Sequence, residues 1–151
     1  MHSTIEHDSA EHPWMRITTL GEFAVERLVP APLLAPNEPR YERVARNEWS
    51  SRGPAMALLK VLLCRPNRRA SRDELLEAIW PDHETINAAH ALDSAVSVLR
   101  QHILHAGEVG SLLLTLRSGG ETVFKLAGQE RIWVDADALL SLMSAAMRAE
   151  C

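Results

Sequence analysis

Apolar residues in the middle of the chain recur at intervals of three and four and predict three consecutive helices. The first helix begins near Pro54, because proline suits a first helical turn, where its missing N–H costs nothing. The sequence Arg-Pro-Asn at residues 65–67 ends this helix. Its apolar positions are Met56, Leu59, Leu62 and Leu63.

The second helix carries a start signal of its own. Ser71 and Glu74 have the spacing of a capping box, in which the serine hydroxyl accepts from the amide three residues on and the glutamate accepts from the serine amide. Pro81 ends the helix. Its apolar stripe consists of Leu75, Leu76, Ile79 and Trp80.

A third helix and a hairpin follow. The helix has one apolar face, made of Ile86, Ala89, Leu92, Val96, Leu99 and Ile103. Two strand-like runs, residues 112–116 and 122–126, then flank the turn Ser-Gly-Gly at residues 118–120. Three helices followed by a hairpin is the order of a winged helix-turn-helix, which places one helix in the major groove of DNA.

Short strands are predicted on both sides of these helices. Residues 16–26 contain two strand-like runs broken at Gly21, and residues 41–46 form a further candidate strand. Between them, four prolines at positions 30, 32, 36 and 39 predict an extended loop. Residues 132–134 are expected to pair with the sheet. Residues 137–147 are expected to form a terminal helix with Leu139, Leu140, Leu142 and Met143 as its apolar positions.

Six short motifs along the chain carry a resemblance to a known family. They are Leu20-Gly21-Glu22-Phe23, Trp49-Ser50-Ser51-Arg52, Ala57-Leu58-Leu59-Lys60, Arg68 to Leu75, Ile79-Trp80-Pro81-Asp82 and Val98-Leu99-Arg100. These motifs resemble the OmpR/PhoB-type winged-helix domain, and the similarity spans residues 15–147. The subgroup that they resemble most is the bacterial transcriptional activators of the SARP kind, in which opening strands precede the helices. Residues 132–137 resemble the junction at which the helical, repeat-containing activation domain of that group begins.

The predicted fold class is therefore α+β: a winged helix-turn-helix with an N-terminal antiparallel β-sheet and a C-terminal β-hairpin wing. We expect residues 1–12 to be a disordered tail and residues 13–134 to be the winged-helix domain. Residues 135–151 are expected to form a C-terminal helix, the possible start of an activation domain.

Composition agrees with a cytoplasmic globular protein. The 151 residues are 46% hydrophobic, but no apolar run is as long as a membrane span, and the start of the chain does not resemble a signal peptide. Two cysteines predict no disulfide framework and suit a reducing compartment. Cys64 lies in an apolar helix and is expected to be buried.

The net charge of −4 argues against nucleic-acid binding, but its distribution weakens that argument. Residues 52–72 contain six basic residues and no acidic one. Arg69 and Arg72 are the candidates for phosphate contact in this segment. The alternative is a solvated turn that is rich in arginine.

The third helix has few groups with which to contact bases. Its outer face holds His90, Ser94, Ser97, Arg100 and Gln101. The resemblance implies several arginines on this helix, and only Arg100 remains. Arginine bonded bidentately to guanine is the commonest specific contact, so Arg100 is the main candidate for base recognition. Alternatively, Arg100 pairs with an acid near the helix end and His90 is a solvated residue.

In the hairpin, Arg117 is the candidate for the minor groove, where narrow sections concentrate negative potential. A cross-strand pairing with Glu121 is the alternative. His102, His105 and Glu108 have spacings that metal ligands also show, but a solvated helix terminus is the expected interpretation. We expect no catalytic residue and no cofactor.

Two functional hypotheses remain. The first is a DNA-binding regulator of transcription whose partner is double-stranded DNA. The second is a winged-helix protein–protein interaction module whose DNA-contacting helix has degenerated. For the second, the candidate partners are RNA polymerase, another protein or a second copy of the chain in a homodimer, and neither hypothesis involves a membrane.

Overall fold

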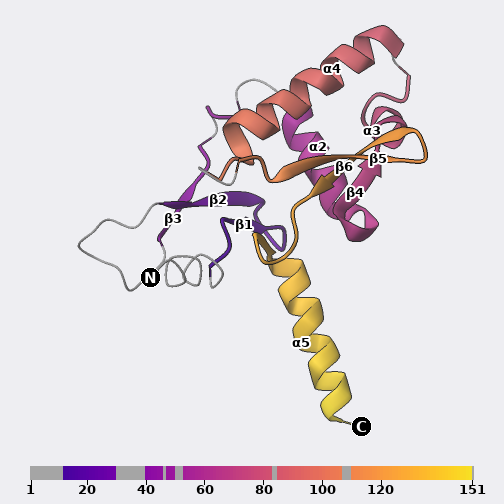
Figure 1. Ribbon diagram of the computed structural model, residues 1–151. Helices are drawn as coiled ribbons and strands as arrows, with labels where there is room; N and C mark the ends of the chain where they lie inside the picture. Colours follow the sequence, from indigo (N-terminus) through magenta and orange to yellow (C-terminus); the bar gives the residue numbers. More distant parts are fainter. Residues whose placement is uncertain are drawn as a thin grey trace, which may run out of the picture. The chain divides into compact units, whose positions relative to one another are not determined.

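The computed structural model describes residues 12–29, 40–45, 47–49, 53–82, 85–106 and 110–150 (Figure 1). The chain forms two compact units. We call residues 1–44 and 128–151 the sheet unit, and residues 45–127 the helical unit. The proline-rich segment and the expected tail, except for its last residue, lie outside the described residues.

The sheet unit contains a four-stranded sheet in the order β3-β2-β1-β7. Strands β1 (Met15–Thr18), β2 (Ala24–Val29) and β3 (Arg40–Arg43) are antiparallel neighbours, as the sequence predicts for the start of the chain. Strand β7 (Ile132–Val134) joins the other edge and runs parallel to β1, so the predicted pairing of residues 132–134 with the sheet is confirmed.

Alternating burial along β1 defines the inner face of this sheet. Met15 and Ile17 are fully buried, whereas Arg16 between them is exposed, because successive side chains of a strand point to opposite faces. The parallel register places Met15 beside Ile132 and Ile17 beside Val134. A small apolar core therefore joins strands that lie more than a hundred residues apart in the sequence.

The helical unit contains the three predicted helices in the predicted order. They are α2 (Gly53–Cys64), α3 (Arg72–Ile79) and α4 (Thr85–Val98), and α4 continues into a π-helical turn at Leu99–Ile103. The side chains of Leu58, Leu62, Leu75, Leu92, Leu99 and Ile103 are fully buried in the core of this unit.

A three-stranded sheet completes the helical unit, in the order β4-β6-β5. Strands β5 (Leu113–Ser118) and β6 (Glu121–Leu126) form the predicted hairpin. Its turn has positive φ at both Gly119 and Gly120, a conformation that glycine adopts without strain. Strand β4 (Arg69–Ser71) pairs with β6, although the sequence indicated only an arginine-rich turn there.

Two expectations about burial are wrong. Ile86 was assigned to the apolar face of the third helix but is 72% exposed, because burial along α4 begins at Ala88. Periodicity identifies the apolar face of a helix, but it does not show how much of the length of that face is covered by other elements. Cys64 is exposed rather than buried: it is the last residue of α2, and its buried neighbours Leu62 and Leu63 occupy the inner face.

Helix α5 (Asp135–Ala149) extends at both ends beyond the helical run expected at residues 137–147 and belongs to the sheet unit. It begins directly after β7, and Figure 1 shows it leading away from the end of that strand. No residue of α5 is buried. Within the described part of the chain, no helix has both the length and the apolar character needed to cross a membrane.

Candidate nucleic-acid interface

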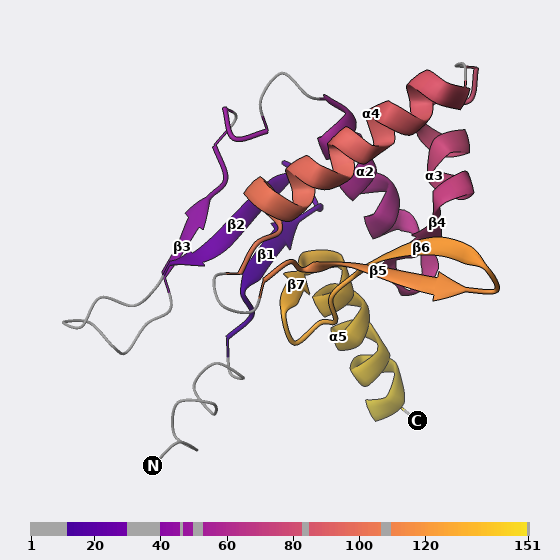
Figure 2. The same cartoon turned by 45° about the horizontal axis from the view of Figure 1, so that its top comes forward.

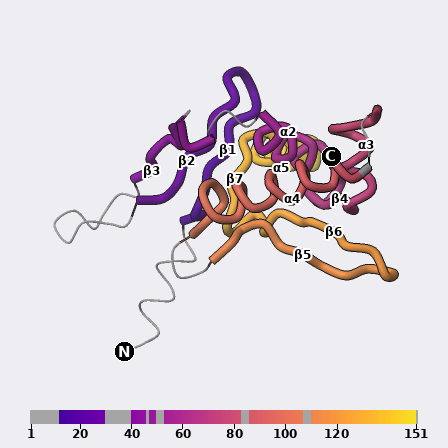
Figure 3. Tube along the Cα trace, turned by 90° about the horizontal axis from the view of Figure 1, so that it is seen from above, coloured from indigo at the N-terminus to yellow at the C-terminus, as the bar shows by residue number. Residues whose placement is uncertain are grey.

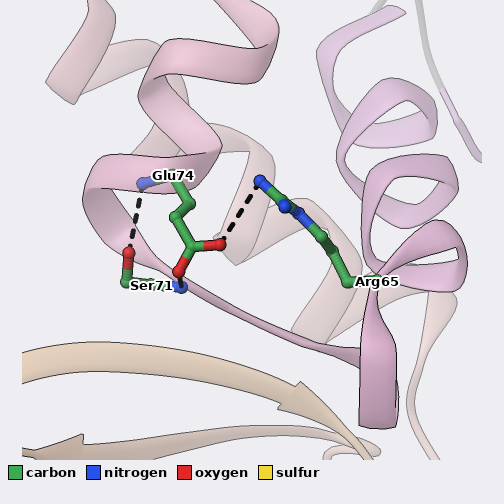
Figure 4. Close-up of polar contacts among 3 residues, drawn as sticks. All are labelled: Arg65, Ser71 and Glu74. Atoms are coloured by element: carbon green, nitrogen blue, oxygen red, sulfur yellow. Dashed lines mark hydrogen bonds and ion pairs between the residues drawn. The ribbon is translucent and has the colours of Figure 1, made fainter.

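The predicted capping box fixes the start of α3. The Ser71 hydroxyl accepts a hydrogen bond from the Glu74 amide at 3.1 Å, and the Glu74 carboxylate accepts one from the Ser71 amide at 3.4 Å (Figure 4). The second carboxylate oxygen of Glu74 forms an ion pair with Arg65 at 3.3 Å. The capping box therefore gives hydrogen-bond partners to backbone amides at the start of α3. Its glutamate also pairs with Arg65, one of the six basic residues of the segment 52–72.

Arg72 joins α3 to α4. Its Nη1 lies 2.7 Å from Asp93 Oδ1, and its Nη2 donates to the Ala89 carbonyl oxygen at 3.5 Å. Two consequences follow for the residues that the sequence predicted to contact DNA. The guanidinium of Arg72 is already engaged with a carboxylate, and the negative charge of Asp93, which would repel phosphate, is balanced within the protein.

The outer face of α4 carries the side chains that the sequence assigned to it. His90, Ser94, Ser97 and Gln101 are exposed, and Arg100 in the following turn is half-buried. The opposite face packs into the core, with Leu92, Ala95, Val96 and Leu99 buried. Val98, where the resemblance implies an arginine, is also buried, so that position offers nothing to a ligand.

A hollow of about 360 Å³ lies between the C-terminal part of the α4 region and the hairpin. Figures 2 and 3 show the helix and the hairpin close together there and diverging toward the hairpin tip. Ser97, Arg100 and Gln101 line it from the helical side. Thr115 and Phe124 line it from the hairpin, together with Asp93 and Val96 of α4. The structure therefore brings three of the predicted residues to one place and adds two strand residues that sequence analysis missed.

The missed residues share a register position. Thr115 of β5 and Phe124 of β6 are direct cross-strand partners, so their side chains lie on the same face of the hairpin. Counting outward from the glycine turn would have paired them from sequence alone. What the count would not reveal is which face of the hairpin lies beside α4.

The guanidinium of Arg100 lies near an aromatic ring. Its Cζ lies 5.9 Å from the centroid of Phe124, within the range of a cation–π contact. No carboxylate among the described residues forms an ion pair with Arg100, so the alternative role of pairing with an acid is not observed there. The guanidinium is placed by a contact that leaves its N–H donors available.

Arg117 lies at the tip of the hairpin and is exposed. Its Nη1 donates to the Gly120 carbonyl oxygen at 3.3 Å, and its register partner is Thr122 rather than Glu121. Thr122 and Phe124 are two residues apart on β6, so Arg117 lies on the same face of the hairpin as Phe124.

Arg69 lies on the other face of this sheet. It stands directly opposite Lys125 in the register, while the neighbouring Ala70 stands opposite Phe124. Like charges directly opposite each other destabilise a sheet. The structure thus separates Arg69 from the hollow and pairs it with a second cation that sequence analysis did not single out.

The polar cluster near the end of the third helix consists of His102, His105 and Glu108. Among the residues that the structure describes, no group of three His, Cys, Asp or Glu side chains is positioned to hold a metal ion. His102 and His105 are exposed, and Glu108 lies outside the described residues.

Comparison with known proteins supports the interpretation of the helical unit. Residues 48–120 match the family described as "Transcriptional regulatory protein, C terminal", which covers just under half of the chain. The match extends from just before α2 to the turn of the β5–β6 hairpin. It supports the resemblance to the OmpR/PhoB type, whereas the SARP subgroup stays a prediction. No curated protein and no solved structure matches the chain.

Proposed function

We propose that the helical unit binds double-stranded DNA and regulates transcription, with the α4 region in the major groove and the β5–β6 hairpin as the wing. The observation that carries this proposal is the shared hollow, where Ser97, Arg100 and Gln101 stand beside Thr115 and Phe124. Helix and wing thereby present hydrogen-bond donors on one side of the unit. The family match over residues 48–120 supports the same function.

Each candidate residue has a role in this proposal. Arg100 contacts a guanine, and Ser94, Ser97 and Gln101 contact neighbouring base edges. Arg117 enters the minor groove, and His90 contacts phosphate. Arg69 contacts phosphate together with Lys125, because an anion between two adjacent cations relieves their repulsion. Arg72 positions α4 through Asp93 instead of touching DNA.

The small number of cations limits the affinity. Arg69, Arg100, Arg117 and Lys125 are the basic groups that this proposal places at DNA. Each neutralised phosphate contributes about −0.9 to the slope of log K against log salt concentration, and Arg69 and Lys125 are the two cations assigned to phosphate, so we expect a shallow slope of roughly −2 for the isolated chain. The proposal includes a cytoplasmic location, since that is where a bacterial chromosome lies.

Arg100→Ala tests the proposal after a preferred site has been selected from a random DNA library. Loss of a bidentate guanine contact should weaken binding to that site by about 1–3 kcal/mol and binding to random DNA much less. Arg131→Ala is the matched control, because it removes the same charge from an exposed position in the sheet unit. Fluorescence anisotropy at two salt concentrations gives both affinities.

Two results would contradict this assignment. Equal losses on the selected site and on random DNA would make Arg100 a phosphate contact. A library selection that enriches no sequence would remove the premise of specific DNA binding altogether.

The second candidate function is binding to RNA polymerase or another protein. It is favoured by Leu114 and Leu116, which are 40% and 39% exposed on the face of the hairpin that carries Lys125. Exposed apolar side chains of this kind suit a protein interface. Replacing Leu116 by Ser should weaken capture of purified RNA polymerase if that enzyme is the partner that this face contacts.

A further inference from the structure

Ile86 is the most exposed large apolar side chain that the structure describes in the helical unit. It is 72% exposed, whereas Leu114 and Leu116 of the hairpin are 40% and 39% exposed. A single exposed apolar side chain is normal on a protein surface, so its position on α4 decides whether it has a role.

Ile86 belongs to the outward-facing row of α4. At 100° per residue, His90 and Ser97 lie within about 40° of Ile86 around the helix axis. Both are exposed, and both are candidate contacts to DNA. Ile86 therefore shares a face with the residues that the proposed function places in the major groove. The opposite face carries the buried residues Ala88, Leu92 and Ala95.

The position of Ile86 along the helix is equally informative. It lies in the first turn of α4 (Thr85–Val98), before burial begins at Ala88. In a helix-turn-helix, the N-terminal residues of the recognition helix contact base edges. The apolar group that a base edge presents in the major groove is the C5 methyl group of thymine. Ile86 thus has the chemistry and the place of a thymine contact.

The next residue, Asn87, is also exposed. Its carboxamide carries a donor and an acceptor, which match N7 and the N6 amino group of adenine in the major groove. Adenine is the partner of thymine in the same base pair. Ile86 and Asn87 therefore match one kind of base pair through two independent chemistries.

We propose that the first turn of α4 recognises an A·T base pair, in which Ile86 packs against the thymine methyl group and Asn87 hydrogen-bonds to adenine. This contact rests on the proposed position of α4 in the major groove and adds a second point of sequence recognition to it. At 1.5 Å per residue, Ile86 lies roughly 20 Å from Arg100 along the helix. The A·T pair therefore lies at the other end of the preferred site from the guanine assigned to Arg100.

Removal of the methyl group from the DNA tests the contact of Ile86. The full chain is measured on the site that it selects from a random DNA library, with each thymine replaced in turn by deoxyuridine, which pairs in the same way and lacks only that methyl group. One of these replacements should weaken binding about fourfold, as expected when one methyl group is no longer buried. The same replacement should not affect binding by Ile86→Ala, because the side chain that covers the methyl group is already gone.

Leu20→Ala is the matched control. It truncates an apolar side chain that is 53% exposed in the sheet unit, so this variant should keep the full effect of deoxyuridine. Ile86→Ala should leave the thermal midpoint unchanged because the side chain is exposed. It should also leave the salt dependence of binding unchanged because it removes no charge.

A parallel cycle tests Asn87. Replacing the partner adenine by 7-deazaadenine removes the N7 acceptor while base pairing is kept. This change should weaken binding by the unaltered chain and should have no effect on Asn87→Ala. Fluorescence anisotropy measures all of these affinities.

Two outcomes would overturn the assignment of Ile86 while the proposed function stands. In the first, Arg100→Ala weakens binding to the selected site, but no deoxyuridine replacement has an effect. In the second, deoxyuridine weakens binding by the unaltered chain and by Ile86→Ala equally, so that another residue contacts the methyl group. A library selection that enriches no sequence would overturn the proposed function and this contact together.

Discussion

Helices α4 and α5 have almost the same length and a similar alternation of apolar and polar residues, yet they are used in opposite ways. Helix α4 has 14 residues, and its apolar face is buried at Ala88, Leu92, Ala95 and Val96. Helix α5 has 15 residues, and none of them is buried. The amphipathic pattern thus specifies which face of a helix is apolar, whereas the neighbouring elements decide whether that face is buried.

The two helices also differ in what holds them in place. Apolar packing along its length holds α4, and the Arg72–Asp93 ion pair adds a polar contact at its side. The hydrogen bonds of one carboxylate, Asp135, hold the first turn of α5. Substitutions in α4 should therefore act through loss of apolar packing, and those in α5 through loss of hydrogen bonds. The expected changes are given below from the largest to the smallest.

The largest difference is expected for leucine truncation. Leu92→Ala removes a fully buried side chain of α4 and leaves a cavity, so it should lower the free energy of unfolding by about 2–5 kcal/mol. Leu142→Ala, the matched change at a 69% exposed position of α5, should alter it by less than about 0.5 kcal/mol in dilute protein. Urea unfolding followed by tryptophan fluorescence compares the two, and equal losses would mean that α5 is covered in solution.

The next effect concerns the attachment of α5. Asp135→Asn replaces one accepting oxygen by an N–H₂ donor, so an amide hydrogen bond from the β1–β2 turn is lost and stability should fall by about 1–2 kcal/mol. Hydrogen exchange at the Thr19 and Leu20 amides reports this locally: both amides should exchange faster. Unchanged exchange would show that the turn is held by its own backbone.

The same carboxylate gives this attachment a dependence on pH. Partial burial raises the pKa of Asp135, but the hydrogen bonds from Leu20, Thr19 and Ala136 outweigh it, and the net pKa lies below the usual value. A lowered pKa means that the contribution is complete above the pKa of the unfolded chain and is lost as pH falls through the folded pKa. Protection of the Thr19 and Leu20 amides should therefore decline only in acid, below about pH 4.

The smallest effect is expected for the ion pair beside α4. Arg72→Met should lower stability by no more than about 1 kcal/mol, because the Arg72 and Asp93 side chains are partly exposed and solvent screens them. A double-mutant cycle with Asp93→Asn measures the coupling, which should weaken at high salt. If Arg72→Met instead reduces DNA affinity and stability is unchanged, Arg72 is a phosphate contact, as the sequence suggested.

Much of the candidate interface could be predicted because it depends on local patterns. Ser94, Ser97 and Gln101 were assigned to an outer helical face by periodicity alone, and the structure places them there. The partner of Arg72 could not be predicted, since Asp93 lies 21 residues away on another helix. The Phe124 ring beside Arg100 was missed for the same reason.

The sequence by itself determined the elements of this protein: helices from apolar spacing, the start of α3 from the Ser71–Glu74 capping box, and the hairpin turn from Gly119 and Gly120. These features depend on interactions within a few residues, which the order of side chains encodes directly. Only the tertiary structure decided which apolar helix faces are buried. Leu92 of α4 is buried, whereas Leu142 of α5 is exposed. The tertiary structure also decided which charges meet, because contacts between distant segments depend on how the elements pack and not on any one of them.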